Sequence, residues 1–147
     1  MEAVEALTYK VVLIDDDIDE AEFLSEAIKE SNLPITLVCY NDYYQFLDSI
    51  FSSSLPHLLV VDINLPIKNG IEAIKELKAH QTLSYIPAVT FTNNTYKRFE
   101  QESKKAGAVQ LIQKPTTTHG YKHLVHIFFT MCANASTGFT NPLNVAC

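Results

Sequence analysis

Short apolar runs alternate along this chain with longer segments in which apolar residues recur every three or four positions. The runs have the length of strands, and the longer segments have the spacing of helices that bury one face. The predicted strands are residues 9–14, 35–39, 58–61, 86–91 and 109–112. The predicted helices are residues 18–31, 41 or 42 to about 51, the stretch after 70 to about 80, 95–106 and 119–133. This alternation predicts an α/β fold with a doubly wound, five-stranded parallel sheet in the order 2-1-3-4-5.

Local signals fix the ends of several predicted elements. Asp17 is placed to cap the first helix, and Gly107 is placed to end the fourth. The second helix is expected to point three side chains inward, namely Tyr44, Leu47 and Phe51. Residues 1–133 are predicted to form one domain. The small and polar residues 134–147 are expected to be a loose C-terminal tail.

Composition and charge narrow the classes of function. The 147 residues are 47% hydrophobic and 19% charged, a globular balance that can bury a core without disulfides or metals. A formal net charge of −6 gives no electrostatic support for binding nucleic acid. No apolar run approaches the ~20 residues that span a bilayer, the start of the chain is acidic, and the three cysteines show no CxxC spacing. We therefore expect a cytoplasmic protein with free thiols that binds neither nucleic acid nor membrane.

Acidic residues concentrate just after the first predicted strand. Three of them, Asp19, Glu20 and Glu22, are interpreted as solvated residues at a helix N-terminus, where carboxylates offset the helix dipole. Asp15 and Asp16 stand instead at the end of the strand itself. These two are therefore candidates for chemistry.

Polar side chains also follow three other predicted strands. Asp62 follows the third strand, Thr92 the fourth and Lys114 the fifth. Ligands of open parallel sheets bind at the carboxyl ends of the strands, and strands one and three are neighbours at the switch point, so Asp15 and Asp16 should lie beside Asp62. Carboxylate oxygens suit Mg²⁺, and a carboxylate can attack phosphorus to form an acyl phosphate. The set predicts a site for a cation and a phosphoryl group.

These motifs resemble those of the receiver domains of bacterial two-component response regulators. The acidic strand end is Val-Leu-Ile-Asp-Asp-Asp at 12–17, and the phosphoacceptor strand with its loop is Val-Val-Asp-Ile-Asn-Leu-Pro-Ile-Lys-Asn-Gly at 60–70. The switch hydroxyl lies in Phe-Thr-Asn at 91–93, and the lysine–proline pair is at 114–115. The similarity covers about residues 9–133 and implies the flavodoxin-like receiver fold.

The resemblance implies a role for each acidic residue. Asp62 would accept a phosphoryl group from a phosphohistidine of a sensor histidine kinase or a phosphotransfer protein. Asp16 and Asp62 would hold Mg²⁺ together with the main-chain carbonyl of Asn64, and Asp15 would help through a water molecule.

The resemblance also implies roles at the fourth and fifth strands, with one departure. Thr92 and Lys114 would bind the phosphoryl oxygens, and the Lys114–Pro115 peptide would be cis. The aromatic residue that the family places three positions before the lysine is Leu111 here. This departure puts the usual aromatic switch in doubt, although it leaves phosphorylation itself unaffected.

The implied function is that of a single-domain response regulator that signals by contact with a downstream protein, without a catalytic output domain. The fourth helix, the fifth strand and the fifth helix form the predicted output surface and the predicted homodimer contact. Apolar residues cover more than one face of the fifth helix, which fits either a wide core contact or a partner surface. They are Tyr121, Leu124, Val125, Ile127, Phe128, Phe129 and Met131. The same helix carries His119, His123 and His126 on one face, interpreted as exposed residues and not as a metal site.

The alternative function is a phosphatase or phosphotransferase of the haloacid-dehalogenase type, which also uses an aspartate at a strand end. Its motif requires Thr or Val at the position of Asp19, and no cap domain is evident. A flavin-binding flavodoxin is a third interpretation, but the first strand lacks the Ser/Thr/Gly-rich loop that would bind the flavin phosphate.

Overall fold

The computed structural model describes the backbone of residues 7–146 and the side chains of residues 7–135. Over these residues strands and helices alternate. The strands are β1 (Tyr9–Ile14), β2 (Ile35–Tyr40), β3 (Leu58–Asp62), β4 (Ala88–Thr92) and β5 (Leu111–Gln113). The helices are α1 (Ile18–Ser31), α2 (Tyr43–Ile50), α3 (Gly70–Ala79), the 3-10 helix η1 (Leu83–Tyr85), α4 (Lys97–Ala106) and α5 (Thr118–Ala146).

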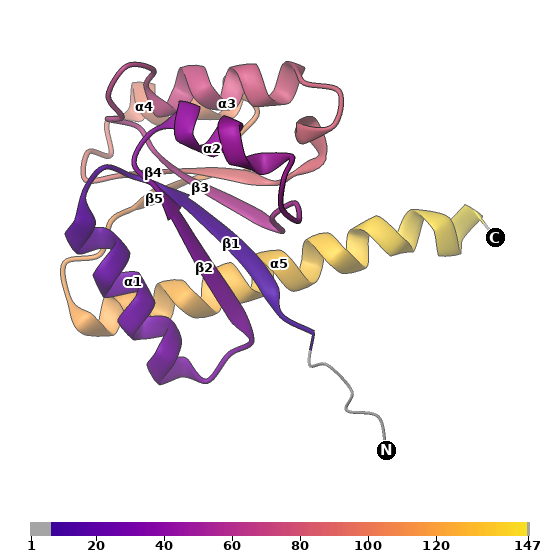
Figure 1. Ribbon diagram of the computed structural model, residues 1–147, viewed down its shortest axis with the longest axis horizontal. Coiled ribbons are helices and arrows are strands. Elements are labelled where there is room, and N and C mark those ends of the chain that lie inside the picture. Colours follow the sequence, from indigo (N-terminus) through magenta and orange to yellow (C-terminus); the bar gives the residue numbers. More distant parts are fainter. Residues whose placement is uncertain (1–6, 147) are drawn as a thin grey trace.

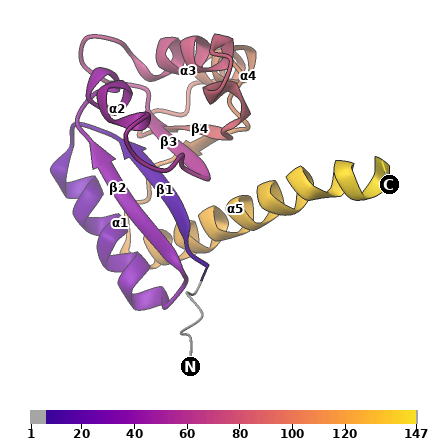
Figure 2. The same cartoon turned by 45° about the vertical axis from the view of Figure 1, so that its right-hand side comes forward.

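The strands form one parallel sheet in the order β2-β1-β3-β4-β5, which confirms the predicted topology. Helices cover both faces of the sheet. In Figure 1, α2, α3 and α4 lie above the sheet and α1 and α5 lie below it, and Figure 2 shows the same two layers from another side. All five strands end at the same edge, because parallel strands share one direction.

The core consists of two apolar layers, one on each face of the sheet. Along β1, Val12 and Ile14 belong to the layer under α2 and α3, whereas Val11 and Leu13 belong to the layer under α1 and α5. A strand covered on both faces needs a continuous apolar run, and β3 supplies one in which every residue is buried. The predicted apolar strands are therefore the centre of the fold.

The predicted phase of the second helix is wrong. The buried side chains of α2 are Tyr43, Phe46 and Ile50, whereas Tyr44 and Phe51 are 42% and 64% exposed; of the three predicted residues only Leu47, which is half-buried, packs against the core. Two apolar stripes run along this segment one residue apart, so spacing alone does not choose between them. The helix begins at Tyr43 because the Asp42 side chain caps it by accepting a hydrogen bond from the N–H of Gln45 at 2.9 Å.

The start of the fourth helix and the starts of two strands lie further along the chain than predicted. The helix α4 begins at Lys97 and not at 95, and β4 and β5 each begin two residues late, at Ala88 and Leu111. Residues 86 and 87, predicted to open the fourth strand, lie outside it, because Ile86 ends the preceding 3-10 helix η1. The predicted ends at Asp17 and Gly107 are confirmed: Asp17 caps α1, and Gly107 takes the left-handed conformation with φ of 110°.

The expectation of a loose tail after residue 133 is also wrong, because α5 continues as a helix to Ala146. Gly138 and Pro142 lower helix propensity at their positions without ending the helix. In both ribbon views the C-terminal part of α5 extends past the edge of the sheet (Figures 1 and 2). The domain boundary at 133 stays a prediction. Within the part of the chain that the structure describes, no helix combines the length and the hydrophobicity that crossing a bilayer requires.

Candidate functional site

Three carboxylates meet at the carboxyl edge of the sheet. Asp15 directly follows β1, and its N–H donates to the Tyr40 carbonyl at 3.0 Å, while Asp62 is the last residue of β3. Because β1 and β3 are adjacent, oxygens of Asp15, Asp16 and Asp62 lie within 4.8 Å of one another. Asp15 and Asp62 are buried, and Asp16 is exposed. The strand order thus brings the three acidic residues together, as the sequence predicts.

Lys114 places an ammonium group among these carboxylates. The main-chain N–H of Lys114 donates to the carbonyl of Thr92 at 2.8 Å, which holds the backbone just after β5 against the end of β4. Its Nζ lies 2.9 Å from Asp15 Oδ2 and 3.4 Å from Asp62 Oδ2. The Lys114 side chain is only 5% exposed, so it is a buried cation paired with two anions and not a surface lysine.

Burial and charge shift the titration of this cluster. Burial raises the pKa of the Asp62 carboxyl to about 6, helped by the neighbouring Asp15 carboxylate and opposed by the Lys114 ammonium. Burial works against the charged form of Lys114, but the two carboxylates outweigh it and hold the pKa of Lys114 above its usual value. When all three carboxyl groups are ionised, the cluster carries three negative charges and only the one positive charge of Lys114.

The donor set fits a hard divalent cation. Asp15 Oδ2 is buried and accepts no hydrogen bond of favourable angle from the described residues, although Lys114 Nζ is close to it. Its close neighbour is the Lys114 ammonium at 2.9 Å, and carboxylate oxygens such as those of the cluster are the ligands that Mg²⁺ prefers. The N–H of Asn64 donates to Asp62 Oδ1 at 3.1 Å, which orients the carboxylate. The main-chain carbonyl of Asn64 remains a predicted ligand.

Thr92 lies at the same edge, fully buried as the last residue of β4. It directly follows Phe91, the residue paired with Asp62 in the sheet register. Its Oγ1 accepts a hydrogen bond from the N–H of Asn94 at 3.0 Å. The Thr92 hydroxyl therefore accepts one hydrogen bond, and its own proton can be donated to another group.

Two backbone features after the strands complete the site. The Lys114–Pro115 peptide is trans, so the cis bond implied by the resemblance is wrong; trans is the isomer that X–Pro peptides favour by about 0.5–1 kcal/mol. Gly70, at the start of α3, lies against the end of β3, and a Cβ there would stand 2.2 Å from the carbonyl oxygen of Asp62. This contact leaves no room for a side chain at position 70.

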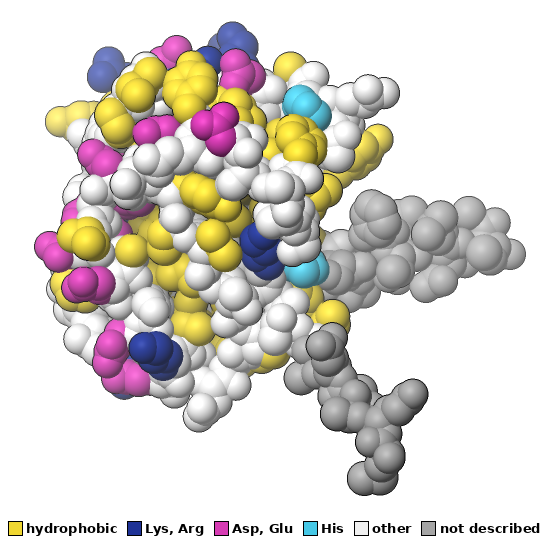
Figure 3. Space-filling view, in the orientation of Figure 1, with side chains coloured by type: hydrophobic (Ala, Val, Ile, Leu, Met, Phe, Trp, Pro, Cys, Tyr) yellow, Lys and Arg dark blue, Asp and Glu magenta, His cyan; other side chains and the backbone are white. Residues whose placement is uncertain are grey.

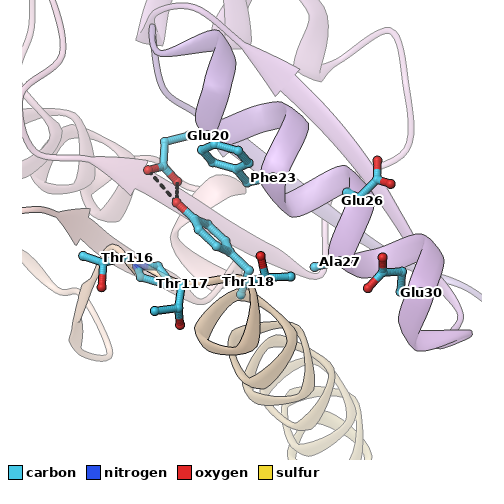
Figure 4. A pocket seen from close by; sticks show the side chains of 10 residues that line it. Glu20, Phe23, Glu26, Ala27, Glu30, Thr116, Thr117 and Thr118 are labelled. Atoms are coloured by element: carbon cyan, nitrogen blue, oxygen red, sulfur yellow. Dashed lines mark hydrogen bonds between the residues drawn. The ribbon is translucent and has the colours of Figure 1, made fainter.

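Sequence reasoning missed a buried carboxylate behind the site. Glu20 is 6% exposed, and the Tyr121 hydroxyl lies 2.8 Å from both of its oxygens and donates to the carboxylate. Figure 4 shows these two contacts at one end of a hollow of about 350 Å³ between α1 and the start of α5. The interpretation of Glu20 as a solvated residue is wrong. Its spacing from the buried Leu24 and Ala27 was the available signal, since i, i+4 and i+7 share one helix face.

Most apolar side chains of the fifth helix pack in the core, which favours the wide core contact over the partner surface. Tyr121, Leu124, Val125 and Phe128 are buried, and most of the remaining apolar side chains pack against the same layer. The three histidines are all exposed, and the one cluster of metal-binding type among the described side chains is the aspartate cluster. Cys39 and Cys132 are free thiols, and Cys147 lies outside the described residues.

Charge is unevenly distributed over the surface. In Figure 3 acidic side chains lie along the left of the view, where Figure 1 places α1, with a basic side chain among them at the lower left, and basic and acidic side chains lie together at the top near α3 and α4. The exposed acidic residues of α1 are Asp19, Glu22, Glu26 and Glu30. The helix α4 carries both signs, with Lys97, Arg98, Lys104 and Lys105 exposed beside the exposed Glu100 and Glu102.

A family model of the response regulator receiver domain matches residues 11–126. The chain belongs to the response regulator receiver family. It is 28% identical over 90 residues to the response regulator Rcp1 of Synechocystis sp., covering 57% of this chain and 61% of that protein. It is 30% identical over 105 residues to the transcriptional regulatory protein FixJ of Bradyrhizobium diazoefficiens, covering 71% of this chain and 49% of that protein. The chain thus spans less than two thirds of the length of either relative.

Solved structures of receivers share the fold. The phosphorylated cyanobacterial phytochrome response regulator RcpA superimposes with a TM-score of 0.73 at 24% identity, covering 81% of this chain and 89% of the other. A Mn²⁺-bound form of Rcp1 gives a TM-score of 0.71 at 22% identity, covering 80% of this chain and 88% of the other. Membership of the receiver family does not favour the haloacid-dehalogenase alternative.

Proposed function

We propose that this receiver accepts a phosphoryl group on Asp62 from a phosphohistidine of a sensor histidine kinase or a phosphotransfer protein. The observation that carries the proposal is the position of Asp62, at the end of the central strand β3 with Asp15 and Asp16 within 4.8 Å and Lys114 Nζ at 3.4 Å. An Asp62 oxygen attacks phosphorus, the P–N bond to the donor histidine breaks as the P–O bond forms, and the histidine nitrogen keeps the electron pair.

Asp15, Asp16, Asp62 and the main-chain carbonyl of Asn64 would hold Mg²⁺. When bound, the ion supplies positive charge beside the incoming phosphoryl oxygens. The Mn²⁺-bound form of the related Rcp1 supports a divalent ion at such a site.

Two side chains of the chain itself would receive the phosphoryl oxygens. Lys114, now 2.9 Å from Asp15 and 3.4 Å from Asp62, can turn its ammonium to an oxygen of the phosphoryl group without leaving the cluster. Thr92 keeps a hydroxyl proton to donate to a second oxygen. The Lys114 ammonium would offset the negative charge that transfer brings into the buried site, and Thr92 would donate a hydrogen bond to it.

The module would act in the cytoplasm by contact with a downstream protein, and this role requires no catalytic output domain. The proposed contact surface is α4, β5 and the exposed side of α5, since Thr92 and Lys114 border these elements. A homodimer through the same surface is part of the proposal, although the core contacts of α5 leave fewer free apolar side chains for it. Light scattering with and without phosphorylation measures this association directly.

Phosphorylation by a small donor tests the proposal. Incubation with acetyl phosphate or phosphoramidate and Mg²⁺ should add one acid-labile phosphate, measured by intact-protein mass. Asp62→Asn should gain none, whereas Asp48→Asn, the same change at an exposed aspartate of α2, should be phosphorylated like the parent. The site assignment is wrong if Asp62→Asn is still labelled or if labelling persists with EDTA in place of Mg²⁺.

A further inference from the structure

The hollow of about 350 Å³ between α1 and the start of α5 has no part in the phosphoryl chemistry proposed above. Two aromatic rings form much of its wall: the ring centroids of Phe23 and Tyr121 lie 5.3 Å apart, and Ala27 and Pro115 also line the hollow. Phe23 is 51% exposed. Ligand pockets in proteins enclose about 300–1,000 Å³ and are mostly apolar, so this hollow has the size and the walls for a small organic molecule.

A buried carboxylate closes one end of the hollow. Glu20 is almost fully buried, and the Tyr121 hydroxyl lies 2.8 Å from both of its oxygens. A tyrosine hydroxyl has one proton to donate, so one Glu20 oxygen is always left without a donor. Among the described side chains none forms an ion pair with Glu20, because Lys114 pairs with Asp15 and Asp62 instead. Burial accordingly raises the pKa of Glu20 above its usual value.

The remainder of the lining adds negative charge and hydroxyl groups. Figure 4 shows Glu26 and Glu30 further along α1, and the three threonines at 116–118 come from the segment that leads into α5. Glu30 pairs with Lys122 at 3.1 Å, whereas Glu26 has no ion-pair partner among the described residues. None of the residues that line the hollow is Lys, Arg or His. The hollow therefore favours a ligand that brings positive charge with it.

We propose that this hollow binds a small organic ammonium ion, with the ammonium group at the Glu20 carboxylate and an apolar body against the rings of Phe23 and Tyr121. The ammonium donates to the Glu20 oxygen that the Tyr121 hydroxyl leaves without a proton, and it supplies the cation that this carboxylate lacks. The aromatic rings add to the attraction, because the face of a ring attracts a cation within about 6 Å of its centroid. A neutral or anionic molecule of the same shape gains neither contact.

Three probes of similar shape test whether charge selects the ligand. At pH 7, 2-phenylethylamine is a cation, 2-phenylethanol is neutral and 3-phenylpropanoate is an anion. Titration followed by two-dimensional ¹H–¹⁵N NMR should show saturable shifts at residues 20–30 and 115–121 with the amine, with an affinity about tenfold or more above that of the alcohol. The carboxylate should cause no shifts there. Equal affinities for the amine and the alcohol, or amine-induced shifts elsewhere, overturn the proposal.

Matched variants assign the contact. Glu20→Gln keeps an oxygen that can accept from Tyr121 but removes the charge, and should weaken amine binding about tenfold or more. Glu22→Gln, the same change at an exposed residue of α1 outside the hollow, should bind like the parent. Phe23→Leu removes a half-exposed ring, should also weaken binding, and keeps the test decisive if Glu20→Gln does not fold. Asp62→Asn should bind the amine like the parent, which separates this inference from the proposed function.

Two outcomes of the variant series contradict the proposal. Parental affinity for the amine in folded Glu20→Gln, or in Phe23→Leu, shows that the ammonium does not bind in the hollow. A loss in Glu22→Gln as large as that in Glu20→Gln shows that binding follows the overall charge of α1 and not the buried carboxylate.

Discussion

The helices on the two sides of the site are fixed to the molecule in different ways. On one side, α1 has a side-chain cap and is tied to α5 by the buried Glu20–Tyr121 hydrogen bonds. On the other side, α4 begins without a side-chain cap and is held at its start through Asn94. Both sides border the same cluster of carboxylates. A change of charge in that cluster should therefore leave α1 and α5 in place and move α4, because the uncapped helix start costs less to displace.

The largest effect should come from breaking the tie between α1 and α5. Tyr121→Phe keeps the ring but leaves the buried Glu20 carboxylate without its hydrogen-bond donor, which should lower the free energy of unfolding by about 2–3 kcal/mol. Urea denaturation measures this loss. Tyr85→Phe, the same change at a tyrosine that is 78% exposed, should have almost no effect. Equal losses in the two variants would show that the Glu20 contact contributes nothing to stability.

The charge of the cluster between the two sides should appear in the pH dependence of stability. The pKa of Asp62 in the folded protein is raised from 3.8 to about 6, so the folded state binds more protons than the unfolded state in this interval. The free energy of unfolding of the metal-free protein should therefore fall as pH rises from 4 towards 7, by about 2 kcal/mol from this group.

Asp62→Asn should remove that fall, and Mg²⁺ should reverse it in the parent protein at pH 7. Thermal unfolding in EDTA and in Mg²⁺ at several pH values measures both effects. A pH profile identical in the parent and in Asp62→Asn would contradict the raised pKa.

A smaller effect on the free energy of unfolding should follow from removing the side-chain cap of α1 and from adding one to α4. Asp17→Ala removes the cap of α1 and should cost about 1 kcal/mol, whereas Tyr96→Ser offers a capping hydroxyl to α4 and should gain about 0.5–1 kcal/mol. Denaturation in metal-free buffer compares the two. Effects of the same sign would remove the difference between the helices.

The smallest expected difference in free energy is that between the local opening of the first turn of α4 and that of the first turn of α1. Amide hydrogen exchange at residues 97–100 should be faster than at residues 18–22, since the first turn of α4 has no side-chain cap. Beryllium fluoride with Mg²⁺ should change protection across 97–113 more than across α1. Changes confined to α1 and α2 would place the output surface elsewhere on the molecule.

Much of the fold could be predicted because continuous apolar strands bounded by polar residues leave few arrangements. The alternation of elements predicted a doubly wound parallel sheet with few possible strand orders, and the meeting of Asp15, Asp16 and Asp62 followed from the order 2-1-3-4-5. Side-chain phase was harder to predict: α2 carries two apolar stripes, and Glu20 is an acidic residue on an inward face. The inward face of α2 and the burial of Glu20 are decided by tertiary partners. The partner of Glu20 is the Tyr121 hydroxyl, and a partner 101 residues away leaves no local pattern in the sequence.

The contact between Gly70 and the carbonyl of Asp62 has a consequence for mutational screens of this protein. In a saturation library scored by signalling output, every side chain at position 70 should push β3 and the start of α3 apart and displace Asp62 with them. Position 70 would then score as poorly as position 62, although glycine has no side chain that could bind metal or phosphate. A map of tolerated substitutions would therefore include the first residue of α3 in the site, because no Cβ atom fits at that position.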